Sequence, residues 1–118
     1  MAERPTITID DVAGSVRVVH AGAVVAESRR ARVLREGNLV PRWYIPREDV
    51  LAELVPSERH SVCPWKGTAS YYGVKIGEKV HPDLVWYYPD ATPETKAIEN
   101  YLCFYNEKVD RIEVNDEK

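Results

Sequence analysis

The chain has 118 residues and a mass of 13.5 kDa, which is the size of one domain. Its composition, 44% hydrophobic and 30% charged, is globular and excludes a wholly disordered chain, and the net charge of −3 lacks the general basicity of nucleic-acid-binding domains. Sixteen valines, seven tyrosines and three tryptophans favour β-strands, because branched and aromatic side chains suit a pleated, half-buried surface.

The first part of the chain predicts short strands separated by turns. The expected strands cover residues 6–9, 16–20, 23–28, 30–35 and 39–45. The pair Ala21-Gly22 is expected to form the hairpin turn between the second and third strands. Gly37-Asn38 is a second turn signal, after the fourth strand.

The rest of the chain predicts two short helices among further strands. Pro46 occupies a helix-entry position, and the apolar spacing that follows predicts a helix over 47–54. Further strands are expected at residues 60–63, 69–76, 84–88 and 111–114. Thr92 and Pro93 have the pattern of an N-cap and first helical position, and residues 97–102 provide a short helical face.

The ends of the chain and its cysteines predict its location and metal content. The first residues lack the apolar region of a secretory signal, and no apolar run approaches the roughly 18 residues of a membrane span. We therefore expect a cytoplasmic protein with no membrane partner. Cys63 and Cys103 stand far apart, and His60 with Cys63 makes only half of a zinc-binding pattern. We expect no metal site, no cofactor and, in a reducing compartment, no disulfide.

Charge is distributed unevenly along the chain. Residues 15–47 hold seven arginines against two acids, a local balance of +5, and residues 78–118 hold ten acids against five bases, a balance of −5. One interpretation is two solvated faces, and the other is a cationic side that recruits an anionic ligand or partner. With a net negative charge over the whole domain, nucleic acid is not the partner that we expect.

The segment His60-Ser-Val-Cys-Pro-Trp-Lys-Gly67 concentrates reactive side chains within one loop. Lys66 could lower the pKa of Cys63, and His60 could accept its proton, which would make Cys63 a nucleophile. If residues 60–63 are extended, however, His60 and Cys63 point to opposite faces of the strand. The alternative is a packed thiol, since a free cysteine is commonly buried.

The aromatic residues allow two interpretations as well. They either meet at a cleft and form a stacking pocket for a flat or cationic ligand, or they fill a small core with their polar tips at the surface. In the run Trp86-Tyr87-Tyr88, the first and third residues share one face of a strand.

Several motifs together are similar to a known family. Residues 44–50 (YIPREDV), 63–67 (CPWKG), then Trp86, Tyr88 and Pro89, and finally Phe104-Tyr105 resemble the family of domain of unknown function 427 over roughly residues 15–114. The resemblance implies a β-tent (Mss4-like) fold of two antiparallel sheets with one or two short helices. It implies no structural zinc here, because the paired Cys-x-x-Cys motifs of zinc-binding relatives are absent.

The resemblance also bears on activity. Some β-tent relatives hold a small ligand in an aromatic cage between the sheets, and methionine sulfoxide reductases of similar fold use cysteine or selenocysteine. The family carries a nucleotidyltransferase-like label, but Gly14-Ser15 is not followed here by the Asp-x-Asp pattern that binds metal and nucleotide.

The leading hypothesis is a single domain over residues 1–118 with one cleft between its sheets that binds a small metabolite, flat or partly anionic. Arg47 and Lys66 would anchor its charge and the indoles would stack on it. The expected lining residues are Trp43, Tyr44, Arg47, Cys63, Trp65, Lys66, Tyr72, Trp86 and Tyr88. Two alternatives stand beside it: an enzyme that uses Cys63, and a protein-interaction module that uses a sheet edge or the arginine-rich face. The sequence carries no signal for an oligomeric state.

Overall fold

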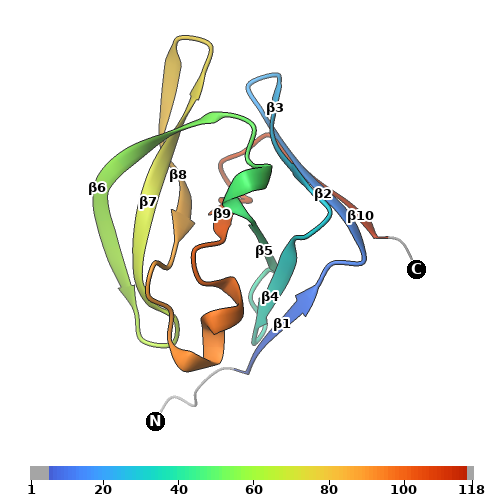
Figure 1. The fold of residues 1–118 in the computed structure, drawn as a ribbon, viewed down its shortest axis with the longest axis vertical. Coiled ribbons are helices and arrows are strands. Elements are labelled where there is room, and N and C mark those ends of the chain that lie inside the picture. The colour runs from blue at the N-terminus through green and yellow to red at the C-terminus, as the bar shows by residue number, and fades with distance from the viewer. Residues whose placement is uncertain (1–5, 117–118) are drawn as a thin grey trace.

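A computed structural model describes residues 6–116, which form two antiparallel sheets and two short 3-10 helices (Figure 1). The larger sheet has the strand order β1 (Ile7–Asp11), β4 (Arg32–Glu36), β5 (Arg42–Ile45), β9 (Leu102–Phe104), β8 (Lys79–Tyr87), β7 (Gly67–Ile76), β6 (Glu53–Cys63). The smaller sheet has the order β10 (Arg111–Asp116), β2 (Gly14–His20), β3 (Ala23–Ser28). The mainly β fold and the two antiparallel sheets are confirmed.

Turn chemistry accounts for the hairpins. Ala21 and Gly22 both have positive φ, 50° and 77°, so the predicted turn between β2 and β3 is confirmed. The left-handed conformation at both positions gives the turn a twist that matches the twist of the strands. In the two-residue turn between β7 and β8, only the first residue, Gly77, has a positive φ, of 61°.

The predicted helix over 47–54 is wrong beyond its first turn. Only η1 (Arg47–Asp49) is helical, and β6 already begins at Glu53. The intervening residues extend along β3, where the Leu51 amide donates to the Val25 carbonyl at 2.8 Å. Leu51 is 63% exposed, so the apolar spacing that suggested a buried helical face reflects extended chain instead. Tertiary pairing with β3 has overridden the local helical pattern.

The second predicted helix ends before its expected apolar face is complete. The helix η2 covers Pro93–Ile98, and Asn100 then takes a φ of 64°, which turns the chain. Leu102 lies in β9, where it pairs with Ile45 of β5. The strand predicted at 60–63 is the end of the much longer β6. Within residues 6–116 no helix has both the length and the apolar character needed to cross a membrane.

The larger sheet is covered on both faces. On one face the inter-sheet core packs it against the smaller sheet, with Val16 and Val18 of β2 and Val25 of β3 fully buried against Val85 and Phe104. The other face carries a second, aromatic cluster, and the segment that contains η2 lies over part of it (Figure 1). Residues 71–74 of β7 and 84–86 of β8 are therefore buried, whereas β6 at the edge of the sheet has no fully buried residue.

The two sheets also meet at a pair of histidines near the ends of β2 and β8. Nε2 of His20 lies 3.3 Å from Nδ1 of His81, and the two rings are edge-to-face with centroids 4.7 Å apart. The carboxylate of Asp110 lies 3.5 Å from Nδ1 of His20. Burial and the neighbouring imidazole lower the pKa of His81.

Candidate functional site

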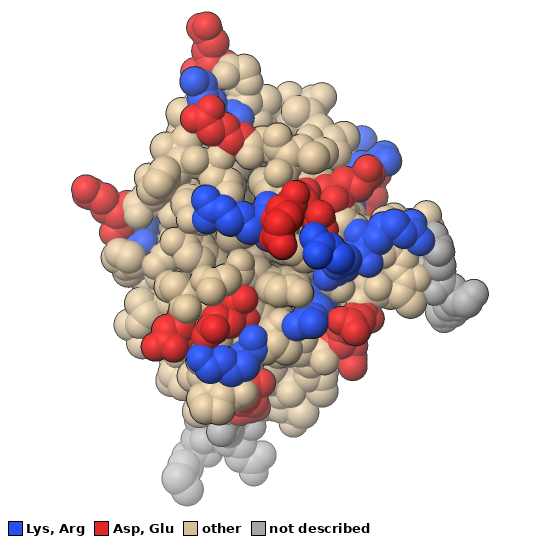
Figure 2. All heavy atoms as spheres, in the orientation of Figure 1, with Lys and Arg blue, Asp and Glu red and all other residues tan. Residues whose placement is uncertain are grey.

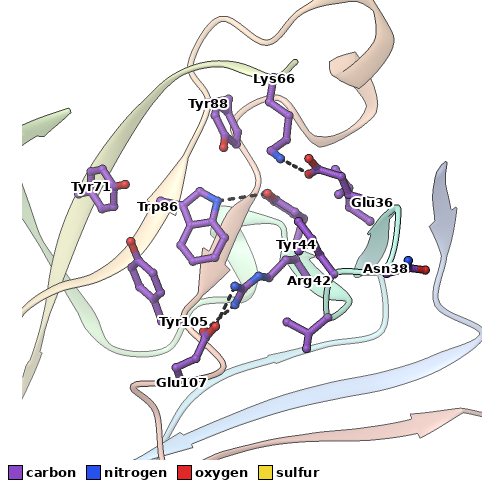
Figure 3. Close-up of a pocket in the computed structure, with 13 residues that line it drawn as sticks. Glu36, Asn38, Arg42, Tyr44, Lys66, Tyr71, Trp86, Tyr88, Tyr105 and Glu107 are labelled. Atoms are coloured by element: carbon purple, nitrogen blue, oxygen red, sulfur yellow. Dashed lines mark hydrogen bonds and ion pairs between the residues drawn. The ribbon is translucent and has the colours of Figure 1, made fainter. Parts of the chain in front are cut away.

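A cavity of about 560 Å³ lies on the face of the larger sheet that carries the aromatic cluster (Figure 3). We call it the aromatic cavity. Its aromatic walls are Tyr44, Tyr71, Trp86, Tyr88 and Tyr105, and its charged residues are Glu36, Arg42, Lys66 and Glu107. Among the residues described, none from the smaller sheet lines it. The expected cleft between the sheets is therefore replaced by a cavity on the opposite face, because the inter-sheet core occupies the space between them.

Strand alternation places the aromatic rings on one face. Tyr44 of β5 and Trp86 of β8 are both register partners of Cys103 in the short strand β9 between them. The indole Nε1 of Trp86 donates to the Tyr44 hydroxyl at 3.1 Å, with the rings edge-to-face. Tyr71 of β7 is the register partner of Trp86 on its other side. The predicted common face for Trp86 and Tyr88 is confirmed, since both line the cavity.

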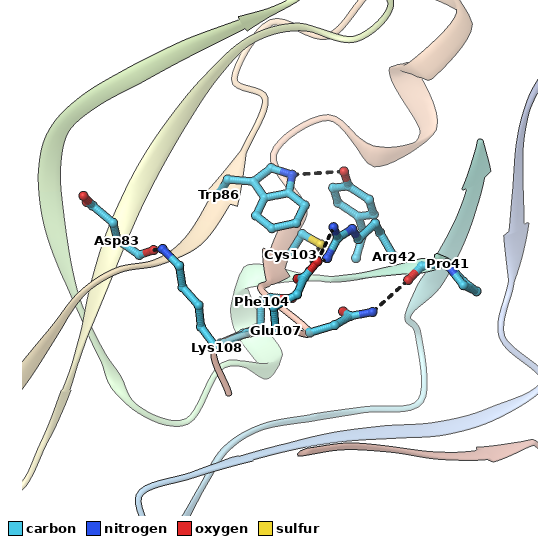
Figure 4. Close-up of polar contacts among 10 residues, drawn as sticks. Pro41, Arg42, Asp83, Trp86, Cys103, Phe104, Glu107 and Lys108 are labelled. Atoms are coloured by element: carbon cyan, nitrogen blue, oxygen red, sulfur yellow. Dashed lines mark hydrogen bonds and ion pairs between the residues drawn. The ribbon is translucent and has the colours of Figure 1, made fainter. Parts of the chain in front are cut away.

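A tethered turn supplies the remaining aromatic wall. Tyr105 follows β9 directly, and its ring meets the Trp86 ring edge-to-face with centroids 4.4 Å apart. Its amide donates to the Leu84 carbonyl at 3.1 Å, and the Asn106 side-chain amide donates to the Pro41 carbonyl at 3.0 Å (Figure 4). Lys108 reaches the backbone carbonyl of Asp83. These bonds hold the turn, and with it the Tyr105 ring, in place.

The cavity contains two internal ion pairs (Figure 3). Lys66 contacts Glu36 at 2.5 Å, and these side chains are only 12% and 13% exposed. Arg42 donates two hydrogen bonds to Glu107, at 2.7 and 2.9 Å, and its guanidinium lies 5.2 Å from the centre of the Trp86 ring. The hydrogen bond from Arg42 lowers the pKa of Glu107 to about 2. Each base is thus matched by an acid within the same site.

The Tyr88 hydroxyl points into the aromatic cavity (Figure 3). The residue is 5% exposed, and burial raises the pKa of Tyr88 well above its ordinary value. Burial also raises the pKa of Tyr105 to about 12. The phenols of Tyr88 and Tyr105 therefore stay protonated and uncharged at neutral pH, so that they act as hydrogen-bonding groups without adding charge.

The structure brings together four of the nine predicted lining residues: Tyr44, Lys66, Trp86 and Tyr88. Trp43 alternates with Tyr44 in β5 and packs against the inter-sheet core on the other face. Whether the four residues bind a ligand remains a prediction.

The other predicted lining residues lie elsewhere. The guanidinium of Arg47 donates to the Tyr72 hydroxyl at 2.6 Å, on the face of the inter-sheet core. Trp65 lies in the turn before β7, and its carbonyl accepts a hydrogen bond from the Thr92 hydroxyl. Cys63 is half-buried at the end of β6, where it packs against the aromatic cluster. Arg47, the expected second charge anchor, is therefore not at the aromatic cavity.

The three candidate catalytic residues form contacts with other groups. His60 lies with its Nδ1 3.2 Å from the Ser70 hydroxyl, and Lys66 pairs with Glu36. His60 and Cys63 both belong to β6, three positions apart, so strand alternation directs them to opposite faces. The described contacts contain no relay between the imidazole and the thiol. Cysteine chemistry remains a prediction.

Sequence reasoning missed the residues that complete the cavity: Glu36, Arg42, Tyr71, Tyr105 and Glu107. Strand alternation was the available signal for Arg42, which stands two residues before Tyr44 on the same strand. Glu36 and Glu107 lie at a strand end and in a turn, and no local pattern links them to their partners.

Part of the arginine-rich segment is paired with acids, most of them from other parts of the chain. Figure 2 shows acidic side chains beside basic ones across one face of the molecule. The ion pairs of this segment are Arg17–Glu27, Arg30–Asp49, Arg32–Asp11 and Arg42–Glu107. These pairs offset part of the local balance of +5 in the sequence. Over residues 6–116, no cluster of three or more His, Cys, Asp or Glu side chains is placed to hold a metal ion.

Comparison with known proteins identifies the family. A search of curated proteins gives no significant match. The model of a family described as a domain of unknown function, DUF427, matches residues 8–115, a slightly longer range than the motifs covered. This match extends over nearly the whole chain and agrees with the motif resemblance. The chain therefore belongs to the DUF427 family.

Proposed function

We propose that this protein binds a small, flat molecule in the aromatic cavity. The observation that carries the proposal is the convergence of five aromatic side chains on a single hollow of about 560 Å³. Small-molecule sites typically have volumes of about 300–1,000 Å³ and mainly apolar walls with a few polar groups. The cavity has this composition, and its polar groups are two ion pairs, the Asn38 side chain and the tyrosine hydroxyls.

The walls are held in place before any ligand arrives. The Trp86 indole is hydrogen-bonded to Tyr44 and contacts Tyr105, whose turn is tied to neighbouring strands. A preorganised site loses little side-chain freedom on binding, so more of the interaction energy appears as affinity. The rim adds apolar surface, because Leu39 and Val40 line the cavity while they are 67% and 54% exposed.

The test is a calorimetric titration with planar bicyclic probes, quinoline and coumarin. We expect binding to the native protein and, in Tyr105→Leu, an affinity about fivefold weaker, since an aromatic pair contributes roughly 1 kcal/mol beyond its buried area. The matched control is Tyr87→Leu, which removes a half-buried tyrosine stacked on Tyr72 on the other face. Absence of binding by both probes, or equal losses in the two variants, would count against the aromatic cavity as the site.

The two alternative hypotheses have separate tests. An enzyme that uses Cys63 predicts faster alkylation of this thiol by iodoacetamide than of Cys103, which is fully buried and whose pKa is raised by burial. A protein-interaction module that uses the arginine-rich face predicts salt-sensitive capture of a partner that charge reversal at Arg30 and Arg32 abolishes. Both arginines already have carboxylate partners within the fold, which gives the second hypothesis less support than the cavity has.

A further inference from the structure

The charged groups of the aromatic cavity balance one another. Glu36 and Glu107 contribute two negative charges, and Arg42 and Lys66 contribute two positive charges. Both pairs are in direct contact, so no base at the cavity lacks an acidic partner and no acid lacks a basic one. The residues that line the cavity therefore carry no net charge, although Arg59 and Lys108, which do not line it, lie against the rings of Tyr71 and Tyr105. If the proposed function is correct, this balance restricts the charge that the ligand can carry.

The Lys66–Glu36 pair makes the constraint strong because it is largely withdrawn from solvent. A ligand anion that binds Lys66 has to displace the Glu36 carboxylate, which then lies nearly buried without its partner. An uncompensated charge in such a place is costly, and the loss of one partner of a buried pair typically costs more than the pair itself gains. A ligand cation that binds Glu36 leaves Lys66 in the same position. Charged ligands of either sign are therefore disfavoured at this pair.

The Tyr88 hydroxyl provides the recognition group that remains. It points into the cavity, and it forms no hydrogen bond with another residue of the described chain, whereas the Tyr44 hydroxyl accepts from Trp86. A hydroxyl that opens into a cavity is a favourable partner for a ligand acceptor, because otherwise its hydrogen-bonding capacity is met only by water. We infer that the aromatic cavity takes a planar, uncharged ligand that carries a carbonyl-type hydrogen-bond acceptor, and that Tyr88 is the donor that recognises it.

Four compounds that share the indole ring system test the inferred preference for an uncharged ligand by calorimetry at pH 7.5. Indole-3-acetamide is uncharged, indole-3-acetate is an anion, tryptamine is a cation and tryptophan is a zwitterion. We expect the acetamide to bind at least tenfold more tightly than the acetate and tryptamine. Tighter binding of the acetate, tryptamine or tryptophan would overturn the inference and leave the proposed function intact. If no member binds while quinoline or coumarin does, the inference fails and the proposed function stands; if none of these planar probes binds, both fail.

Two variants test the residues that carry the argument. Tyr88→Phe keeps the ring, and it should weaken indole-3-acetamide about tenfold while leaving the affinity for indole, which has no carbonyl, unchanged. Tyr87→Phe on the other face is the matched control and should change neither affinity. Equal effects of Tyr88→Phe on the two probes would contradict its role as a donor.

Glu36→Gln keeps a hydrogen-bond acceptor for Lys66 but removes the negative charge, so the cavity gains a net charge of +1. The preference should then shift toward the anion, with indole-3-acetate binding at least tenfold more tightly than it binds the native protein. An unchanged order of affinities in folded Glu36→Gln would show that charge balance does not select the ligand. Circular dichroism establishes that the variant is folded.

Discussion

The ion pair between Lys66 and Glu36 should be one of the most sensitive points in the fold. The two groups are 2.5 Å apart with side chains only 12% and 13% exposed, so Lys66→Met leaves the Glu36 carboxylate nearly buried and unpaired. Breaking a buried pair typically costs about 3–5 kcal/mol, and the residual exposure places this one at the lower end, about 3 kcal/mol. For a domain of this size that corresponds to a fall in Tm of about 12 °C.

The measurement is urea-induced unfolding at pH 7, followed by tryptophan fluorescence and far-UV circular dichroism. Lys96→Met, the matched control, removes an exposed lysine paired with Glu99 and should leave the midpoint unchanged. The double variant Lys66→Met/Glu36→Leu should recover to within about 1 kcal/mol of the native protein, because an apolar pair no longer buries a charge. If Lys66→Met is as stable as the native protein, the pair is solvated in solution, and the inferred preference for an uncharged ligand loses its basis.

Three further predictions concern stability and pH. Glu107→Gln should cost about 1 kcal/mol at pH 7, since Glu107 is 57% exposed and solvent screens its bond to Arg42. With the pKa of Glu107 lowered to about 2, this stabilisation is present above about pH 4.5 and is lost as the pH falls toward 2, so urea unfolding of the two proteins should converge there. Gly67→Ala should destabilise by more than about 1 kcal/mol, because φ is +112° and the added Cβ would lie 2.9 Å from the Asp90 carbonyl oxygen; a Tm equal to that of the native protein would contradict this geometry. The pKa of His81 is lowered in the fold. As the pH falls below about 6.5, this histidine is therefore protonated in the unfolded chain before it is protonated in the folded protein, and the stability of the fold declines. His81→Gln should therefore flatten the dependence of Tm on pH between 7 and 5, and an unaltered slope would exclude this histidine as its source.

Local patterns were sufficient for most of the strands. Alternation and turn residues predicted the β2–β3 hairpin, and the shared face of Trp86 and Tyr88 followed from strand geometry alone. The helix predicted over 47–54 failed because the chain after η1 pairs with β3, a segment more than twenty residues earlier. Apolar spacing cannot distinguish a helical face from extended chain whose hydrogen bonds go to a distant strand.

For the candidate site as well, local patterns predicted some of the residues and failed for others. Trp43 and Tyr44 are equally prominent in the sequence, yet β5 directs them to opposite faces of the sheet, and only Tyr44 reaches the cavity. Arg47 was expected as a charge anchor, but Arg42 holds that place because it shares a face with Tyr44. Once the strand is known, alternation makes this choice, so this part of the site was accessible to sequence reasoning.

The sequence by itself determined the excess of valine, tyrosine and tryptophan, the turns, and the family motifs, and these specify a mainly β domain of the DUF427 family. The tertiary structure alone decided which aromatic residues form one cavity and that the charges there cancel. Lys66 meets Glu36 from thirty positions away and Arg42 meets Glu107 from sixty-five. Such pairs depend on strand order and register, which arise from burying whole sheet faces at once and leave no local signal at either residue.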